Sequence, residues 1–529
     1  MMRFSFYEEE LVRKFWMAVL LLFCCLALAG CGEGETPRGE REIVLAAGRD
    51  LAPGAKDPYF STVILKTWES LVGISNEGKA VPVLAESWEA NGDKTEWTFH
   101  LRRGVTFHDG VPFDAAAVVE NFYRVTHMGY KPSSFYGYQV RRIYPGLLRY
   151  EALDAYTVRL TFEKPVPMLI YRMAGWGSAM FSPKCFDRET GDFTEYAKGT
   201  GPFQIADRKD DDYTVIERYD GYWGEKARAR RIRVKVITSP EARYSAMKSG
   251  EVQGVLDLGG LTPMMAEDLL KDERFAESHA KSTISHYLSV NGTRFPMSDE
   301  RLRQAVNLAI DRNLIAKAYF RGYAVPTMGF LNTTNPFGKV YPLVYDPEKA
   351  RRLAGEVLGG RRQPVVFLIP QYGADRYPYK VIAELIQAEL APIGLDVEIR
   401  LVDGMTGRKL MKGGDYDFSI GTRGLGNLDP TSLLYEFFDS KGATNKASSF
   451  DYVNPAVDEA FDELAHTYDV EDRAKLYDRI QDELVAHPAV VPLLEDQNLA
   501  VYSWELTGYE AAVYGITLDK VAWKEEGGA

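Results

Sequence analysis

The stretch DPEKARRLAGEVLGGRRQPVVFLI (residues 346–369) decides the fold class, because it joins a helix to a buried strand. Asp346-Pro347-Glu348-Lys349 supplies a helix start, with proline at the first helical position. The pattern predicts a helix over 347–357 and a strand over 364–369. A second helix at 379–392 and a second strand at 396–401 repeat this order. Helices that alternate with short apolar strands predict an α/β layer architecture.

Outward from this stretch, further elements follow from local patterns. Asp114 is placed as the N-cap of a helix over 114–125, and Asp109-Gly110 predicts a turn that links a strand to this helix. The remaining expectations are a helix at 299–320 and strands at 43–47, 94–101, 156–162 and 231–237. Gly199-Thr200-Gly201-Pro202 predicts a turn in which glycine gives freedom for positive φ and proline a fixed φ.

The N-terminal segment reads as a secretory signal rather than as part of the fold. An apolar run over 15–30 follows Arg13-Lys14 and ends in Leu28-Ala29-Gly30-Cys31. This arrangement resembles a bacterial lipoprotein signal, which implies cleavage after residue 30 and lipidation of Cys31. The alternative is a transmembrane anchor, but the run is shorter than the roughly 20 residues that a spanning helix needs. Because Glu8-Glu9-Glu10 is unusual in a signal, translation starting at Met17 stays a second possibility.

Composition narrows the class of protein. The 529 residues suit two or three domains once the signal is removed, and residues 31–42 form a Gly-, Glu- and Pro-rich tether. The net charge of -12, without a basic stripe, makes nucleic acid a poor partner. Of the four cysteines, Cys185 alone lies within the expected fold. No disulfide framework can therefore form, and we interpret Cys185 as a small buried residue.

An ordered series of motifs resembles the bacterial extracellular solute-binding proteins of family 5, the peptide-, opine- and nickel-binding receptors of ABC importers. The resemblance covers nearly all of the mature sequence, and the ordered set is far more specific than any one motif. The motifs are LAESW (84–88), WTFHLR (97–102), FHDGVPFDA (107–115), GTGPF (199–203), YWG (222–224), RLRQA (301–305), AIDR (309–312) and YDPEKA (345–350).

The resemblance implies an α/β, two-lobed periplasmic-binding-protein fold of type II, in the large cluster with an extra subdomain in lobe 1 and a hinge between the lobes. We expect lobe 1 at 43–280, its extra subdomain at about 66–198, lobe 2 at 281–496 and a C-terminal return to lobe 1 at 497–529. The implied protein is a lipid-anchored, periplasmic or otherwise extracytoplasmic receptor, monomeric, and without cofactor. It encloses a solute by lobe closure and delivers it to ABC permease subunits.

In this family one loop of the second lobe reads the ligand, and the resemblance places it at residues 422–430. Dipeptide-binding members carry a tryptophan and an ammonium-pairing aspartate here, at the positions of Arg423 and Gly426. The guanidinium of Arg423 suits bidentate recognition of a carboxylate, and Asn427 offers a donor or acceptor. The alternatives are an ion pair for Arg423 and turn chemistry for Asn427. An anionic, peptide-like or opine-like solute fits best.

Aromatic residues complete the expected ligand site. The family lines its cleft with rings, and the matching positions are Phe135, Tyr136, Tyr138 and Trp176; ordinary packing is the alternative.

A metal chelate is an alternative ligand, since nickel-chelate members also use arginine and aromatic residues. However, residues 439–454 contain no histidine, and Ala179 stands where that branch carries an arginine before Ser182-Pro183. His100 and His108 lack a second histidine at metal-binding spacing, so we expect no metal ligands in the protein itself.

A secreted enzyme is a rival class, but no GxSxG motif occurs. A sensory or chaperone-like binding protein on the same fold stays open.

Overall fold

The computed structural model describes residues 41–51, 64–75, 77–128, 143–191, 193–194, 196–256, 260–374, 377–424, 427–513 and 515–525, without the side chain of Trp176. The chain divides into a short unit, Met1–Arg41, and a compact unit, Glu42–Ala529. The expected signal, Cys31 and the expected tether up to residue 40 lie outside the described residues. In the described part of the chain, no helix has both the length and the apolarity to cross a membrane.

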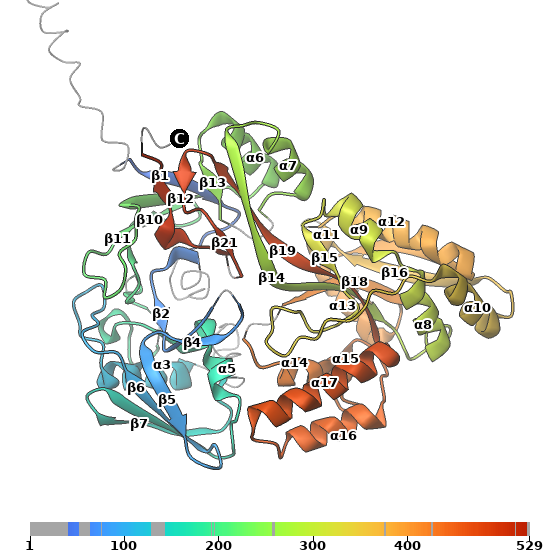
Figure 1. Cartoon of the computed structure of the whole chain (residues 1–529), viewed down its shortest axis with the longest axis horizontal. Helices are drawn as coiled ribbons and strands as arrows, with labels where there is room; N and C mark the ends of the chain where they lie inside the picture. The colour runs from blue at the N-terminus through green and yellow to red at the C-terminus, as the bar shows by residue number, and fades with distance from the viewer. Residues whose placement is uncertain are drawn as a thin grey trace, which may run out of the picture. The chain divides into compact units, whose positions relative to one another are not determined.

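One mixed sheet organises the compact unit (Figure 1). Its order is β10-β11-β12-β1-β13-β19-β14-β18-β16-β17, with β15 paired to β19. The strands are β1 (Ile43–Ala47), β10 (Phe203–Lys209), β11 (Tyr213–Arg218), β12 (Arg231–Val236), β13 (Gly254–Val255), β14 (Phe275–Val290), β15 (Ala324–Pro326), β16 (Gln363–Pro370), β17 (Leu395–Val402), β18 (Phe418–Gly424) and β19 (Val490–Ser503).

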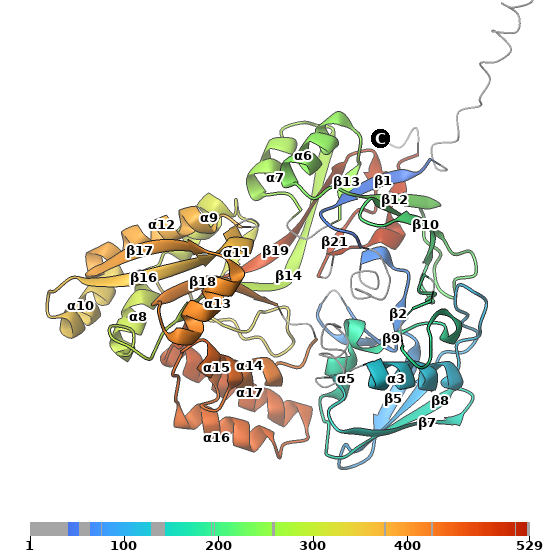
Figure 2. The same ribbon diagram turned by 180° about the vertical axis from the view of Figure 1, so that it is seen from behind.

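The long strands β14 and β19 join two separately packed halves of this sheet, as the two opposite views show (Figures 1 and 2). Their antiparallel pairing shifts register between Lys281 and Ser285. At one edge of this pair β19 pairs with β13, and at the other β14 pairs with β18. We call the half that contains β1 and β10–β13 the first lobe and the half that contains β15–β18 the second lobe.

The first lobe carries a second, four-stranded sheet with its own core. Its order is β5-β6-β8-β7, formed by Ala85–Ala90, Glu96–Leu101, Thr157–Phe162 and Leu147–Asp154. Helix α3 (Ala115–Met128) packs on this sheet through buried Val118 and Phe122. Further elements of this lobe are α5 (Leu169–Met173), α6 (Pro240–Ser249), α7 (Pro263–Leu269), β2 (Glu69–Ser70), β3 (Val72–Ile74), β4 (Ala80–Pro82), β9 (Ala179–Met180), β20 (Leu506–Thr507), β21 (Ala511–Ala512), β22 (Gly515–Ile516) and β23 (Ala522–Trp523).

Helices cover the second lobe around two cores, one on the β16–β18 sheet and one among the helices after β18. The helices are α8 (Glu300–Ala309), α9 (Arg312–Tyr319), α10 (Pro347–Leu358), α11 (Gln371–Ala374), α12 (Tyr379–Leu390), α13 (Gly404–Gly413), α14 (Thr431–Phe438), α15 (Ala443–Ala447), α16 (Pro455–Leu464) and α17 (Val470–Ala486).

The expected caps are confirmed. The Oδ1 atom of Asp114 accepts the amide of Ala117 at 2.9 Å, and Oδ1 of Asp346 accepts that of Lys349 at 2.8 Å. Each bond satisfies one amide that has no partner within its helix.

Two local expectations were wrong. The single helix expected at 299–320 is two helices, because the chain leaves helical geometry at Ile310 and Asp311 caps α9 through the amide of Leu314 at 3.0 Å. Gly199 and Gly201 do not adopt positive φ. Glycine is required there for space, since a Cβ atom on Gly199 would lie 2.3 Å from the carbonyl oxygen of Thr67. Gly110, by contrast, has φ 78° and forms the expected turn.

Candidate functional site

The loop that the resemblance assigns to ligand recognition, residues 422–430, includes the end of β18 and leads to α14. We call it the recognition loop. Arg423 lies near the end of β18, opposite Ser285 of β14, so the central sheet positions its backbone. Leu425 and Gly426 lie outside the described residues. The loop resumes at Asn427 and ends where Thr431 begins α14.

Arg423 is partly exposed and forms a long ion pair with Glu436. Its side chain is 35% exposed, and its nearest carboxylate, Glu436, is 4.0 Å away. The guanidinium lies 5.1 Å from the ring centroid of Phe437, a distance at which a cation and an aromatic face attract. Burial raises the pKa of the neighbouring Tyr287 to about 12, although the charge of Arg423 acts in the opposite direction. This half-open site therefore offers a positive charge beside aromatic rings, which suits an anionic group.

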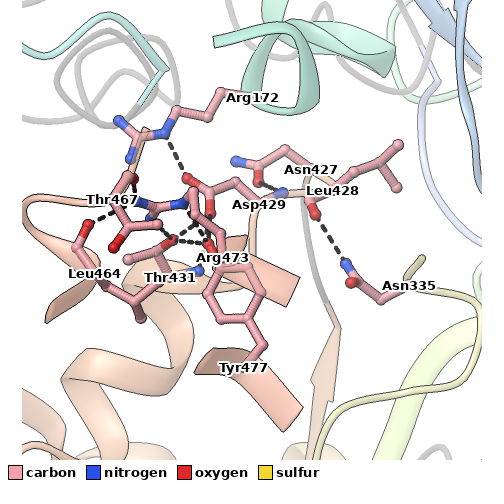
Figure 3. Close-up of polar contacts among 10 residues, drawn as sticks. All are labelled: Arg172, Asn335, Asn427, Leu428, Asp429, Thr431, Leu464, Thr467, Arg473 and Tyr477. Atoms are coloured by element: carbon pink, nitrogen blue, oxygen red, sulfur yellow. Dashed lines mark hydrogen bonds and ion pairs between the residues drawn. The ribbon is translucent and has the colours of Figure 1, made fainter. Parts of the chain in front are cut away.

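Asn427 takes part in turn chemistry. Its Oδ1 atom accepts the amide of Asp429 at 2.9 Å (Figure 3). This bond shapes the loop just before α14.

Most of the other predicted residues lie outside the described part of the chain. This applies to Phe135, Tyr136, Tyr138 and Gly426. The backbone of Trp176 belongs to a short 3-10 helix, Gly175–Ser178, that follows α5. Of the predicted site residues, the described part of the chain includes Arg423, Asn427 and the backbone of Trp176.

Sequence reasoning missed a buried junction centred on Asp429 (Figure 3). The Nε atom of Arg172, from α5 of the first lobe, lies 2.6 Å from Oδ2 of Asp429. The Oδ1 atom accepts the amide of Thr431 at 3.0 Å and its hydroxyl at 2.5 Å. Burial by itself raises the pKa of Asp429, but Arg172 and these hydrogen bonds outweigh it, so the pKa lies below its usual value.

A second buried carboxylate, Glu69, borders a cavity of about 300 Å³ in the first lobe. It accepts hydrogen bonds from Tyr222 at 2.7 Å, Trp223 at 2.7 Å and Thr200 at 2.8 Å. Burial raises the pKa of Glu69, although these donors act against the shift. The YWG and GTGPF motifs therefore have a shared structural role, because both supply donors to one buried acid.

The histidines and the cysteine have structural contacts. His108 bonds the carbonyl oxygen of Gly201 at 2.9 Å, and burial lowers its pKa to about 4. His100 lies 3.8 Å from Glu89 on an exposed strand face. Cys185 is buried, and its Sγ atom donates to the carbonyl of Ser182 at 3.0 Å. Within the described ranges, no three His, Cys, Asp or Glu side chains converge as a metal site.

Comparisons with known proteins show the family of the chain. A family model described as "Bacterial extracellular solute-binding proteins, family 5 Middle" matches residues 79–445. The glutathione-binding protein GsiB of Salmonella paratyphi A is 26% identical in an alignment of 485 residues that covers 89% of this chain and 92% of GsiB.

Solved structures share the fold. NikA from Brucella suis, in complex with Fe(III)-EDTA, superposes with a TM-score of 0.79 at 23% identity over 92% of this chain and all of that one. The periplasmic binding protein DppA from Helicobacter pylori, in complex with the peptide STSA, gives 0.69 at 24% identity over 92% and 99%. Both relatives are two-lobed binding proteins, as is this chain. The chain therefore belongs to the bacterial extracellular solute-binding proteins of family 5, the substrate-binding receptors of ABC importers, which are not enzymes.

Proposed function

We propose that this receptor captures a small anionic solute, peptide-like or opine-like, between its two lobes and delivers it to an ABC permease. The observation that carries the proposal is Arg423, a partly exposed guanidinium on the recognition loop whose nearest carboxylate is 4.0 Å away. A free carboxylate on a ligand would give this cation a bidentate partner at hydrogen-bonding distance. Glutathione, which the relative GsiB binds according to its name, carries such groups.

A metal chelate is the second candidate. The likeness to NikA with Fe(III)-EDTA favours it, since such a chelate presents carboxylates to arginine. The absence of histidine from residues 439–454 argues against direct nickel ligation by the chain. A sensory or chaperone-like role on the same fold is a further candidate, favoured by no particular contact.

We also propose the lobe boundaries and the anchorage. The register shift between Lys281 and Ser285 supports a hinge near residues 281 and 496, with lobe 1 at 43–280, lobe 2 at 281–496 and a return at 497–529. The separate sheet and core support the subdomain at about 66–198. Cys31 carries the lipid in this proposal, which tethers a monomer outside the cytoplasm through residues 31–42.

Native mass spectrometry on the protein as purified from a bacterial host tests the ligand class. A mass excess that denaturation removes reveals the captured solute, and fragmentation separates peptide-like acids from metal chelates. The apo protein is then titrated with glutathione, dipeptides and nickel–histidine. An anionic organic ligand supports the proposal. A cationic or uncharged ligand contradicts it, and a nickel isotope pattern favours the second candidate.

A further inference from the structure

Two successive residues of the recognition loop contact two successive residues of the first lobe. The amide of Leu428 donates to the carbonyl oxygen of Tyr171 at 2.9 Å, and Asp429 pairs with Arg172 at 2.6 Å. Tyr171 and Arg172 both belong to α5, which packs into the core of the four-stranded sheet. A backbone bond and an ion pair thus fix the same loop at adjacent points. Figure 3 shows the ion pair.

The contact is buried and reciprocal. Leu428 is 3% exposed and packs into the first-lobe core that contains α5. Met168, just before α5, packs into the helical core of the second lobe, and the ring of Tyr171 lies 5.4 Å from that of Phe337. Each lobe therefore places an apolar side chain in the core of the other. Separating the lobes would expose both side chains to water, which opposes opening.

The second-lobe side of the contact is held in place independently of the first lobe. The hydroxyl of Thr431, which bonds Asp429, is 2.6 Å from the hydroxyl of Tyr477 and accepts from Arg473 at 3.0 Å. The carbonyl oxygen of Leu428 accepts from Asn335 at 3.1 Å. Because these partners already orient the loop, contact with α5 requires little further ordering.

We propose that Arg172 and Leu428 are positioning residues that hold the recognition loop against the first lobe, so that lobe closure and placement of the loop's ligand-facing residues are coupled. Arg423 and Asn427 belong to the same short connection as Leu428 and Asp429. A ligand that contacts Arg423 or Asn427 and binds more tightly when the lobes are in contact favours that contact, and the lobe contact in turn favours ligand binding by the same factor. Only this ligand half rests on the proposed function.

Hydrogen exchange on the ligand-free, full-length protein tests the lobe contact. We expect Arg172→Ala to speed amide exchange on the order of tenfold in residues 168–174 and, across the lobes, in 427–434, because an uncompensated buried carboxylate favours separation. Arg172→Lys, which keeps the charge, should recover part of the protection. Arg188→Ala is the matched control, since Arg188 is exposed and pairs with Glu120 within the same lobe at 3.0 Å; its exchange should equal that of the wild type.

A second variant separates positioning from general stability. Leu428→Ala removes the inserted side chain but keeps the ion pair, and it should loosen the same two segments. Unchanged exchange in either segment, or a uniform increase throughout the chain, would overturn the proposal. Failure of the ligand screen would refute the proposed function yet leave this result intact, since no ligand enters the measurement.

Discussion

Gly201 lies directly against the backbone of Lys66, where a Cβ atom on the glycine would be 2.2 Å from the carbonyl oxygen of Lys66. The neighbouring amide of Phe203 donates to that same oxygen at 3.2 Å. The chain can pass this close only because glycine has no side chain.

We therefore expect Gly201→Ala to lower the free energy of unfolding by about 2–3 kcal/mol, because a backbone carbonyl cannot move aside as a flexible side chain can. Urea denaturation measures the change. Gly355→Ala is the control, since nothing lies within 4 Å of its Cβ position in the exposed face of α10. There alanine should raise stability by up to about 1 kcal/mol. Equal effects at the two positions would contradict the close approach.

Arg423→Ala should weaken ligand binding by about 1.5–3 kcal/mol if its guanidinium pairs with a ligand carboxylate. Isothermal titration calorimetry with the solute identified by mass spectrometry measures this loss. Arg400→Ala is the matched control, because Arg400 lies in the same lobe on β17 and pairs with exposed Glu398 at 2.6 Å. Unchanged affinity in Arg423→Ala would refute its role as the anion anchor.

The buried acid Glu69 should tolerate an amide better than an apolar side chain. Glu69→Gln can turn its carbonyl oxygen towards Trp223 and Thr200 and donate its amide to the hydroxyl of Tyr222, so we expect a loss of about 1 kcal/mol or less. Glu69→Leu leaves these buried donors without an acceptor and should cost about 2–4 kcal/mol. Thermal unfolding compares the two variants. Equal losses would show that the hydrogen bonds of Glu69 contribute little.

The raised pKa of Glu389 on α12 predicts that the stability of the protein depends on pH. Burial raises its pKa to about 7, although the amide of Asp311, which bonds it at 3.2 Å, acts against the shift. A carboxyl whose folded pKa exceeds its unfolded value adds stability that is full below about pH 4.5 and is lost as the pH rises through 7. The wild type should therefore lose stability relative to Glu389→Gln between pH 5 and pH 8.

Urea unfolding at the two pH values checks this expectation. Glu384→Gln, at an exposed position of the same helix, is the control and should track the wild type. A stability difference between the wild type and Glu389→Gln that stays constant from pH 5 to pH 8 would contradict the raised pKa.

Local patterns predicted those elements whose determinants lie within a few residues of one another. Asp114 and Asp346 cap their helices through bonds to residues three positions away, so spacing alone revealed them. The strand expected at 43–47 is observed as β1 with the same bounds. The break between α8 and α9 was missed because apolar residues continue through Ile310, while the cap at Asp311 is visible only as a hydrogen bond.

Fewer residues of the candidate site could be predicted from the sequence. Arg423 and Asn427 could be singled out through the family resemblance, and that resemblance also supplied their expected roles. The role of Arg172 was not predicted, since nothing in its local sequence indicates a partner in the other lobe.

By itself, the sequence determined the α/β class, the helix caps and the membership of a receptor family, because each depends on short-range patterns or on an ordered set of motifs. Only the tertiary structure decided that Gly199 and Gly201 serve close packing, and that Arg172 meets Asp429 from 257 positions away. Such contacts depend on how separately packed cores come together. That arrangement results from burial summed over the whole chain, which no local pattern encodes.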